Sequence, residues 1–307
     1  MALHQTSGRW RLGLALALAT AFFWATLPVA LKLALEVVDA VTLTWFRFLV
    51  ASIVIGAWLA WRGGLRRFRH LDQGAWLLLA IAALGLIGNY LGYLFGLGYT
   101  SPANAQLLIQ LAPLLLAIGG VAIFRERLNL KQWCGYGAVA LGLLLFFAEQ
   151  SQRVSGGSYG LGVLLIVLAA AAWAGYALAQ KQLLRQLDSA AILWVIYVAA
   201  TVLLLPISHP TQLLRVDAVH WWAIAYCAIN TIGAYGCFAE ALAHWEASRV
   251  SAVLALTPIL TVISVAVFAW AVPGAIAPER IGALGWAGAF TVVLGSAAVS
   301  LMATRRG

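Results

Sequence analysis

The side chains of this chain that could bind a solute are aromatic and polar residues within strongly apolar segments. They recur every three or four residues, the spacing of one helix face. Trp173, Tyr176 and Gln180 are three and four residues apart, so on a helix they share one face. In an earlier segment, Trp24 and Pro28 are likewise four residues apart. Indole, phenol and amide groups bind apolar side chains, cations and hydrogen-bonding groups without covalent chemistry. These stretches therefore predict a binding surface for a small amphipathic solute.

Polar groups of this kind recur along the chain, and at lipid depth they usually face protein or water. The residues predicted to line a central cavity and bind the solute are Trp24, Asn89, Tyr90, Tyr93, Tyr99, Gln106, Gln110, Trp173, Tyr176, Gln180, Asn230, Tyr235 and Thr257. The candidates for a proton site or a gate are Glu240, His244, Lys32 and Lys181. The predicted hinges are Pro28, Pro113 and Pro258, because proline interrupts a helix. Core packing stays an alternative for the aromatic residues, and snorkelling to the membrane interface for the two lysines.

Ionisable residues are scarce in the same segments. Arg47 has no carboxylate close to it in sequence, and a structural pairing is favoured over contact with the solute. Glu240 and His244 are the candidates for proton coupling, while a passive facilitator or an exchanger is an equal alternative. A phosphorylated solute would require several Lys or Arg at mid-depth, so that class of substrate is disfavoured.

Composition decides which elements carry these residues. Of the 307 residues, 64% are hydrophobic and only 9% are charged, with a mean hydropathy of +0.94. In soluble domains about a quarter of the residues are charged. Apolar segments long enough to cross a hydrocarbon core are predicted at 12–33, 40–61, 74–97, 101–123, 131–149, 160–184, 190–207, 219–241, 248–271 and 280–303. The predicted fold class is therefore all-α integral membrane, with ten transmembrane helices.

Lysine and arginine are distributed unevenly between the predicted loops. If the N-terminus is cytoplasmic, the inner side holds 14 of the 19 basic residues and the outer side four, with Arg47 inside a helix. Inner loops carry the excess of positive charge, so both termini are predicted to be cytoplasmic in a multi-pass inner (plasma) membrane protein. The net charge of +9 is explained by this topology, and no nucleic-acid partner is predicted.

An internal repeat relates the two halves of the chain. A shift of 149 residues places Trp24 on Trp173, and a shift of 145 places Tyr90 on Tyr235. Because each half has five crossings, an odd number, the second half enters the membrane from the opposite side. This pattern predicts an inverted repeat, an architecture of secondary transporters with alternating access. The two predicted repeats, sharing one membrane body, are residues 1–150 and 151–307.

Several motifs occur in the same order in both halves. The first half contains "RF" at Arg47-Phe48, then "GYTSPANAQLLIQLAPLLLA" and "FRERLNLKQWCGYGAVALG"; the second contains "ALAHWEASRVSAVLALTPIL" and "ERIGALGWAGAFTVVLG". On these motifs the chain resembles the drug/metabolite transporter superfamily, in particular its EamA-type ten-helix members. Within that superfamily it is similar to amino-acid exporters of the YddG kind. It departs from the family pattern at Ala25, where a glycine is common, and in the "VPGAIAP" that delays the second acidic-basic pair.

The resemblance implies a secondary transporter of small amphipathic metabolites, above all amino acids, working by export or facilitated exchange. A multidrug or organic-cation efflux transporter is the alternative, and a membrane-embedded enzyme or a channel is less favoured. "GGSYG" fits the G-x-S-x-G pattern of serine hydrolases but lacks its strand-to-helix context, so no catalytic residue is predicted. No cofactor or metal is expected. The expected partners are the solute, the lipid bilayer and, through a homodimer, a second copy.

Glycines in the last predicted helix of each half offer a surface for close helix contact. The helices predicted at 131–149 and 280–303 are expected to pack against each other or to form the dimer contact. The glycines concerned are Gly135, Gly142, Gly288 and Gly295.

Overall fold

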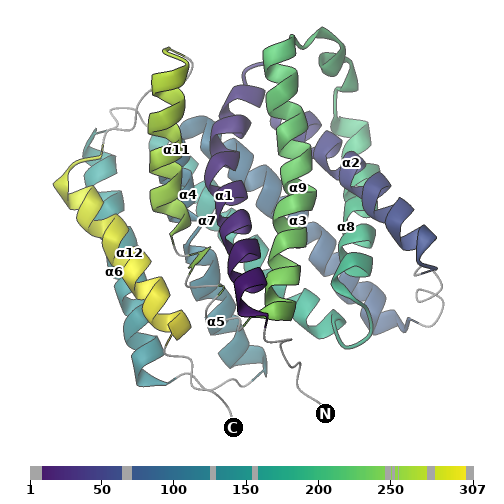
Figure 1. Ribbon diagram of the computed structural model, residues 1–307, viewed down its shortest axis with the longest axis horizontal. Coiled ribbons are helices and arrows are strands. Elements are labelled where there is room, and N and C mark those ends of the chain that lie inside the picture. The colour runs from purple at the N-terminus through teal and green to yellow at the C-terminus, as the bar shows by residue number, and fades with distance from the viewer. Residues whose placement is uncertain are drawn as a thin grey trace.

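The computed structural model describes residues 9–63, 71–124, 129–153, 158–245, 250, 253–254, 256–274 and 281–301. Every regular element within these ranges is a helix (Figure 1). The helices of the first half are α1 (Trp10–Ala34), α2 (Ala40–Trp61), α3 (Gln73–Tyr99), α4 (Pro102–Leu108), α5 (Leu111–Phe124) and α6 (Leu130–Arg153). Those of the second half are α7 (Ser158–Leu183), α8 (Ser189–Leu204), the 3-10 turns η2 (Leu205–Ile207) and η3 (Pro210–Arg215), α9 (Ala218–His244), α11 (Thr257–Ala271) and α12 (Ala283–Leu301).

Seven segments in the described part of the chain are long and apolar enough to cross a membrane, by length and composition. They comprise α1, α2, α3, α4 with α5, α6, α7 and α8 with η2. The helices α11 and α12 are shorter apolar helices, and α9 has 27 residues. The chain is thus an all-helical multi-pass protein, whereas the count of ten crossings stays a prediction.

Four helices begin directly after an aspartate that accepts hydrogen bonds from amides of the first turn. Asp39 precedes α2, Asp72 precedes α3, Asp188 precedes α8 and Asp217 precedes α9. Such N-caps satisfy amides that the helix itself leaves unpaired. Asp39 and Asp188 are 149 residues apart, and Asp72 and Asp217 are 145 apart, which are the two shifts of the internal repeat.

The segment predicted as one helix at 101–123 is broken in the structure. The turn at Ile109 and Gln110 separates α4 from α5, and Pro113 follows it. Proline has no amide hydrogen for the carbonyl four residues earlier. The carbonyl of Ile109 instead accepts from the amide of Ala112, at 2.9 Å. In the second half, α11 begins at Thr257 with Pro258 in its first turn, so the interruption recurs at the shift of 145.

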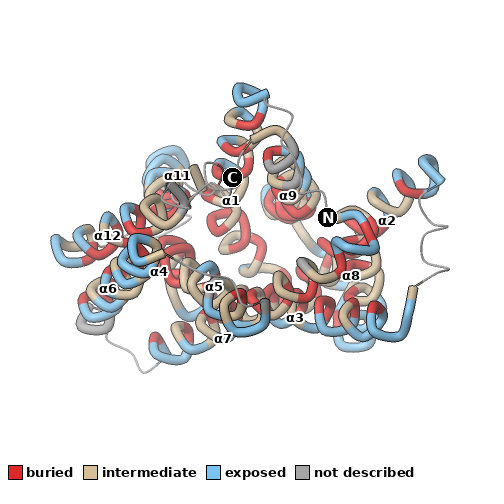
Figure 2. The backbone as a smooth tube through the Cα atoms, turned by 90° about the horizontal axis from the view of Figure 1, so that it is seen from below, coloured by how far each residue is buried: buried red, intermediate tan, exposed pale blue. Residues whose placement is uncertain are grey.

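The helix contacts follow a pattern that exchanges the two halves. The most extensive contacts are those of α3 with α7, α6 with α12 and α1 with α9. If α1, α2, α3 and α6 correspond to α7, α8, α9 and α12, the α3–α7 contact becomes the α1–α9 contact. The contacts α2–α9 and α3–α8 exchange in the same way, while α2–α8 and α6–α12 map onto themselves. In the view of Figure 2, buried residues face between the helices and exposed residues face outward.

Glycines allow α3 and α7 to approach closely. A Cβ atom added to Gly96 would lie 2.9 Å from the carbonyl oxygen of Gly162, a distance that real Cβ atoms do not reach. One added to Gly92 would lie 3.1 Å from the carbonyl oxygen of Leu165. The absence of side chains here brings the two backbones together. The predicted glycine pairing of α6 with α12 is also observed, at one edge of the molecule in Figure 1.

Polar contacts join the segments at the upper side of Figure 1, where α1 ends and α9 begins. Nδ1 of His220 lies 2.5 Å from the carboxylate of Asp217, and its Nε2 lies 3.4 Å from that of Glu36. His209, which directly precedes η3, lies 3.4 Å from the carboxylate of Asp39. These contacts connect the first half of the chain to the second outside the helix bundle.

Candidate functional site

Aromatic side chains from six helices gather between the two halves of the chain. We call them the central aromatic cluster. Its members are Trp24 of α1, Phe48 of α2, Tyr90 of α3, Trp173 and Tyr176 of α7, Tyr197 of α8 and Tyr235 of α9. Tyr176, Tyr197 and Phe48 are buried, whereas Trp24, Trp173 and Tyr235 are half-buried. The cluster thus combines a closed interior with partly accessible rings.

Ring contacts connect these residues across the helices. The Tyr235 ring meets the edge of Trp24 with centroids 5.9 Å apart. Phe48 lies 4.6 Å from Tyr90 and stacks on Tyr197 at 5.3 Å, again between centroids. Edge-to-face and offset stacked pairs are the favoured arrangements of aromatic rings. Rings on different helices therefore hold one another at fixed orientations.

Hydroxyl and indole groups add polar contacts within the cluster. The Tyr90 phenol lies near the side chains of Thr231 and Tyr235. The Trp173 side chain in turn lies near Tyr235. Trp173 also meets Tyr176 edge to face at 6.3 Å. Two residues that the internal repeat relates, Tyr90 and Tyr235, thus belong to one packed cluster at the boundary between the halves.

A buried arginine completes this arrangement. Arg47 of α2 is 2% exposed, and its Nε donates a hydrogen bond to the hydroxyl of Thr231 at 3.0 Å. Its guanidinium carbon lies 4.7 Å from the centroid of the Tyr90 ring. A cation over a phenol face is attracted by the ring quadrupole, more strongly where water is excluded. Arg47 also interacts electrostatically with Tyr93, Tyr197 and other groups around it.

The structure brings many of the predicted binding residues together. Trp24, Tyr90, Trp173, Tyr176 and Tyr235 all belong to the central aromatic cluster. A second predicted pair is also in contact: the Tyr93 hydroxyl donates to Oε1 of Gln106 at 3.2 Å. Residues predicted from their spacing along single helices therefore contact one another between different helices.

Two predicted asparagines lie instead at helix–helix contacts. The Asn89 amide donates to the carbonyl of Ala169 in α7 at 3.0 Å. That of Asn230 donates to the carbonyl of Phe23 in α1 at 2.7 Å. Both residues are at least 90% buried. Each amide hydrogen bond thus ties a helix of one half to a helix of the other.

Four further candidates lie apart from the cluster contacts. Tyr99 is 47% exposed at the end of α3. Gln110 is half-buried at the break between α4 and α5. The Thr257 hydroxyl donates to the carbonyl of Leu254, so it closes a turn at the start of α11. Gln180 is half-buried in α7. The helix break around Gln110 places its side-chain amide near the point where Pro113 interrupts regular hydrogen bonding.

The prolines and the gate candidates differ in their surroundings. The helix α1 continues through Pro28, and the carbonyl of Ala25, three residues earlier, accepts a hydrogen bond from Ser264 of α11 at 3.0 Å.

The Lys32 ammonium donates to the carbonyl of Leu97 at 2.9 Å and to that of Thr100 at 3.2 Å. It thereby satisfies carbonyls at the end of α3, as basic residues commonly do at helix C-termini. The side chain of Lys181 lies outside the described residues.

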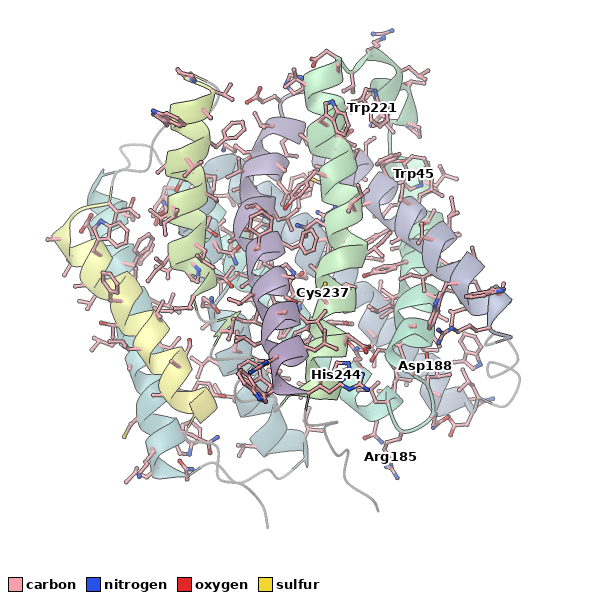
Figure 3. The ribbon with its side chains drawn as sticks, in the orientation of Figure 1. Trp45, Arg185, Asp188, Trp221, Cys237 and His244 are labelled. Atoms are coloured by element: carbon pink, nitrogen blue, oxygen red, sulfur yellow. The ribbon has the colours of Figure 1, made fainter. Side chains whose placement is uncertain are left out.

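The two residues considered for a proton site, Glu240 and His244, contact each other. Nε2 of His244 lies 3.0 Å from the carboxylate of Glu240, one helical turn earlier in α9. The Glu240 side chain is 61% exposed and that of His244 is 14% exposed. Figure 3 labels His244 near the lower end of α9, with Cys237 higher on the same helix. The pair is therefore at one end of the bundle, away from the contacts of Arg47.

Sequence reasoning did not select Arg47, Phe48 or Tyr197 for this site. The sequence favours a structural pairing for Arg47, presents Phe48 only as part of the "RF" motif, and does not single out Tyr197. One signal was present for Arg47: a permanently charged residue within an apolar helix, without a nearby carboxylate in sequence. No local pattern distinguishes Phe48 or Tyr197 from core residues, because their role depends on contacts between α2, α3 and α8.

Comparisons with known proteins agree on the family of the chain. The EamA-like transporter family model matches it twice, at residues 11–148 and 160–301. An inner membrane transporter of Escherichia coli (strain K12), YhbE, is 37% identical over 292 residues, covering 93% of this chain and 90% of its own length. A transporter of Haemophilus influenzae is 35% identical over 286 residues, covering 93% of each chain. A solved structure entitled "Crystal structure of protein" covers 97% of this chain and 98% of its own at a TM-score of 0.65 and 20% identity, which supports the fold.

Proposed function

Because the chain belongs to the EamA-like transporter family, a multi-pass family of the drug/metabolite transporter superfamily in the inner membrane, we propose that it carries amino acids. Transport would be export or facilitated exchange of these small amphipathic metabolites. The mechanism would be alternating access around the central aromatic cluster.

One observation carries the substrate proposal: aromatic rings and hydrogen-bonding groups from both halves meet at one place. Half-buried Trp24 and Trp173 provide apolar faces for a side chain. Tyr235 contacts both of them, and its hydroxyl provides a polar group beside these faces. An amino acid has an apolar side chain next to an ammonium and a carboxylate, so it matches such a mixed surface.

The alternating-access proposal rests on an inverted repeat of residues 1–150 and 151–307, with ten crossings and both termini cytoplasmic. Three features support it. The helix contacts exchange between the halves, the capping aspartates recur at shifts of 149 and 145, and α11 repeats the interruption near Pro113. Two units of the same fold in opposite orientations can exchange conformations, which opens a shared site to either side in turn.

Efflux of organic cations is the alternative function, favoured by the rings around Trp24. Its centroid lies 5.9 Å from that of Tyr235 and 5.7 Å from that of Phe238. Aromatic faces attract cationic ligands. Arg47 opposes this alternative, because its permanent positive charge repels a cation brought into the same cluster. An enzyme is not proposed, and among the described residues His, Cys, Asp and Glu form no group of three that could hold a metal.

The test is counterflow uptake of a labelled amino-acid panel into proteoliposomes. We expect saturable exchange by the wild type, strongly reduced by Trp173→Ala in the central aromatic cluster, and reduced by Gln110→Ala at the break between α4 and α5, which tests the predicted lining outside the cluster. Trp270→Ala is the matched control, because Trp270 is 83% exposed in α11 and its removal should leave exchange intact. Exchange of organic cations without any amino acid would favour the alternative. Amino-acid exchange that survives both site variants would retain the function and reject this site.

A further inference from the structure

Arg47 has more hydrogen-bond donors than the structure satisfies. Its Nε donates to Thr231, and its guanidinium lies over the Tyr90 ring. Among the described residues, no acceptor is found for its two terminal amino groups. A guanidinium stays charged at every relevant pH, so it cannot escape the cost of burial by losing a proton. A buried charge normally has a partner of opposite charge.

The acidic residues of the described chain are all engaged elsewhere. The chain contains 10 Asp and Glu residues, of which Glu126, Glu246 and Glu279 lie outside the described ranges. The remaining ones are the four capping aspartates, Glu36 beside His220, Glu240 beside His244, and Glu149. Glu149 accepts hydrogen bonds from the amides of Gly282 and Gly285 at the start of α12. No described carboxylate therefore compensates Arg47.

A second unsatisfied group lies in the same cluster. Tyr197 is 0% exposed, yet its hydroxyl has no hydrogen-bond partner in the described part of the structure. The Phe48 ring stacks on Tyr197 with centroids 5.3 Å apart and lies 4.6 Å from Tyr90, the ring that the Arg47 guanidinium covers. An unpaired buried hydroxyl is costly. The guanidinium requires an acceptor that carries negative charge and the phenol requires an acceptor, so one carboxylate can satisfy both.

We propose that Arg47 and Tyr197 bind the carboxylate of the transported solute. This inference rests on the proposed transport function and narrows its substrates to solutes that carry a carboxylate. The two terminal amino groups of Arg47 match both oxygens of a carboxylate, and Tyr197 donates from α8. The apolar part of the solute then contacts the rings of Trp24, Trp173 and Tyr235. Both binding groups are buried in this conformation, so movement of α2 relative to α8 and α9 must expose them during transport.

The first experiment compares two solutes that differ only at the carboxyl end. L-Phenylalanine and L-phenylalaninamide share a ring and an amine, but the amide has no carboxylate. We expect wild-type proteoliposomes to exchange phenylalanine with a KM at least tenfold below that of the amide. Arg47→Gln should remove this preference by raising the KM for phenylalanine. Arg47→Lys should recover it only in part, because an ammonium lacks the two-pronged geometry.

Tyr197→Phe provides a variant that preserves folding, since it deletes only an unpaired hydroxyl. It should raise the KM for phenylalanine severalfold without affecting the amide. Tyr159→Phe is the matched control: the Tyr159 hydroxyl is also buried without a partner, but the residue stacks on Phe147 of α6, outside the cluster. If wild-type exchange is measured and Arg47→Gln and Tyr197→Phe both keep the wild-type KM and preference, the carboxylate site is wrong while the transport function stands.

A binding measurement separates the two proposals if no amino acid is exchanged. The thermal midpoint of the purified wild type is measured with phenylpropionate, with phenethylamine and without ligand. Stabilisation by phenylpropionate that is absent in Arg47→Gln and weaker in Tyr197→Phe would support the carboxylate site independently of amino-acid transport. Stabilisation by phenethylamine alone, or by neither compound, would overturn it.

Discussion

Gly142 of α6 and Gly288 of α12 bring their two helices into backbone contact. A Cβ atom added to either glycine would lie 2.6 Å from the carbonyl oxygen of the other. Gly135 and Gly295 form the same kind of contact further along the pair. The two helices that end the halves of the chain are therefore joined through glycines within one molecule. A homodimer, if formed, would use other surfaces of this pair.

Gly142→Ala should destabilise the protein, because the added methyl group forces α6 away from α12. Overpacking of this kind costs about 1–3 kcal/mol. Thermal unfolding in a fixed detergent is the measurement. Gly137→Ala is the matched control in the same helix, since nothing lies within 4 Å of its added Cβ. It should be neutral or stabilising by about 0.5–1 kcal/mol. Equal unfolding midpoints for the two variants would contradict the close contact.

Pro113→Ala should slow turnover while leaving apparent affinity unchanged. Alanine restores an amide that can bond the carbonyl of Ile109, so the helix can close across the break between α4 and α5. If this break is a hinge, the rate of exchange falls severalfold. Initial rates of counterflow at several substrate concentrations separate kcat from KM. Pro210→Ala, in η3, serves as the control, because a proline at the first helical position costs no hydrogen bond. Unchanged turnover would reject the hinge.

Lys32→Met should lower stability without changing substrate affinity. The ammonium of Lys32 holds the carbonyls of Leu97 and Thr100, so its loss leaves the end of α3 unpaired at a cost of about 1 kcal/mol. A gate residue would instead change exchange kinetics. Thermal unfolding and counterflow on the same preparation distinguish the two roles. Lys131→Met, at an exposed lysine of α6, is the matched control and should change neither quantity.

Acid should weaken the cap of α2. Burial of the Asp39 carboxyl raises its pKa, but hydrogen bonds from Thr42, His209 and Val41 outweigh burial and hold the pKa below its usual value of 3.8. A depressed pKa in the folded state adds stability above the unfolded pKa, and that stability is lost as pH falls through the folded value. Asp39→Asn retains a capping oxygen without the charge. Its unfolding midpoint should therefore fall less steeply than that of the wild type between about pH 5 and 3; parallel curves would refute this.

His220 should connect the two halves more firmly at pH 6 than at pH 8. A neutral imidazole has one N–H donor, whereas the protonated ring has two and can donate to Asp217 and Glu36 together. Wild type and Glu36→Gln should therefore differ in unfolding midpoint at pH 6 and converge at pH 8. Glu240→Gln provides a comparison at the other end of α9, where the carboxylate contacts His244 within one helix. A difference between wild type and Glu36→Gln that is independent of pH would exclude this role of the histidine.

Sequence patterns predicted single helices well and their interruptions less well. The segment at 40–61 coincides with α2, because an apolar run bounded by Asp39 and Arg62 leaves little choice of ends. The segment at 101–123 was predicted as one helix, although Pro113 was expected to act as a hinge. The break was missed because hydropathy is continuous across Ile109 and Gln110, whereas the backbone hydrogen bonds are not.

The amino-acid sequence is sufficient to predict an all-helical membrane protein, because apolar length and scarce charge leave few other solutions. It also indicates which helix faces carry polar groups, since spacing along one helix is a local property. Which of these faces meet is visible only in the folded chain. The tertiary structure places Asn89 and Asn230 at helix contacts and joins Arg47 to Thr231, 184 residues away. Helix rotation and crossing depend on packing between distant segments. That packing places the Tyr90 phenol and the Thr231 hydroxyl beside Arg47, whereas the described carboxylates lie at helix ends or beside histidines.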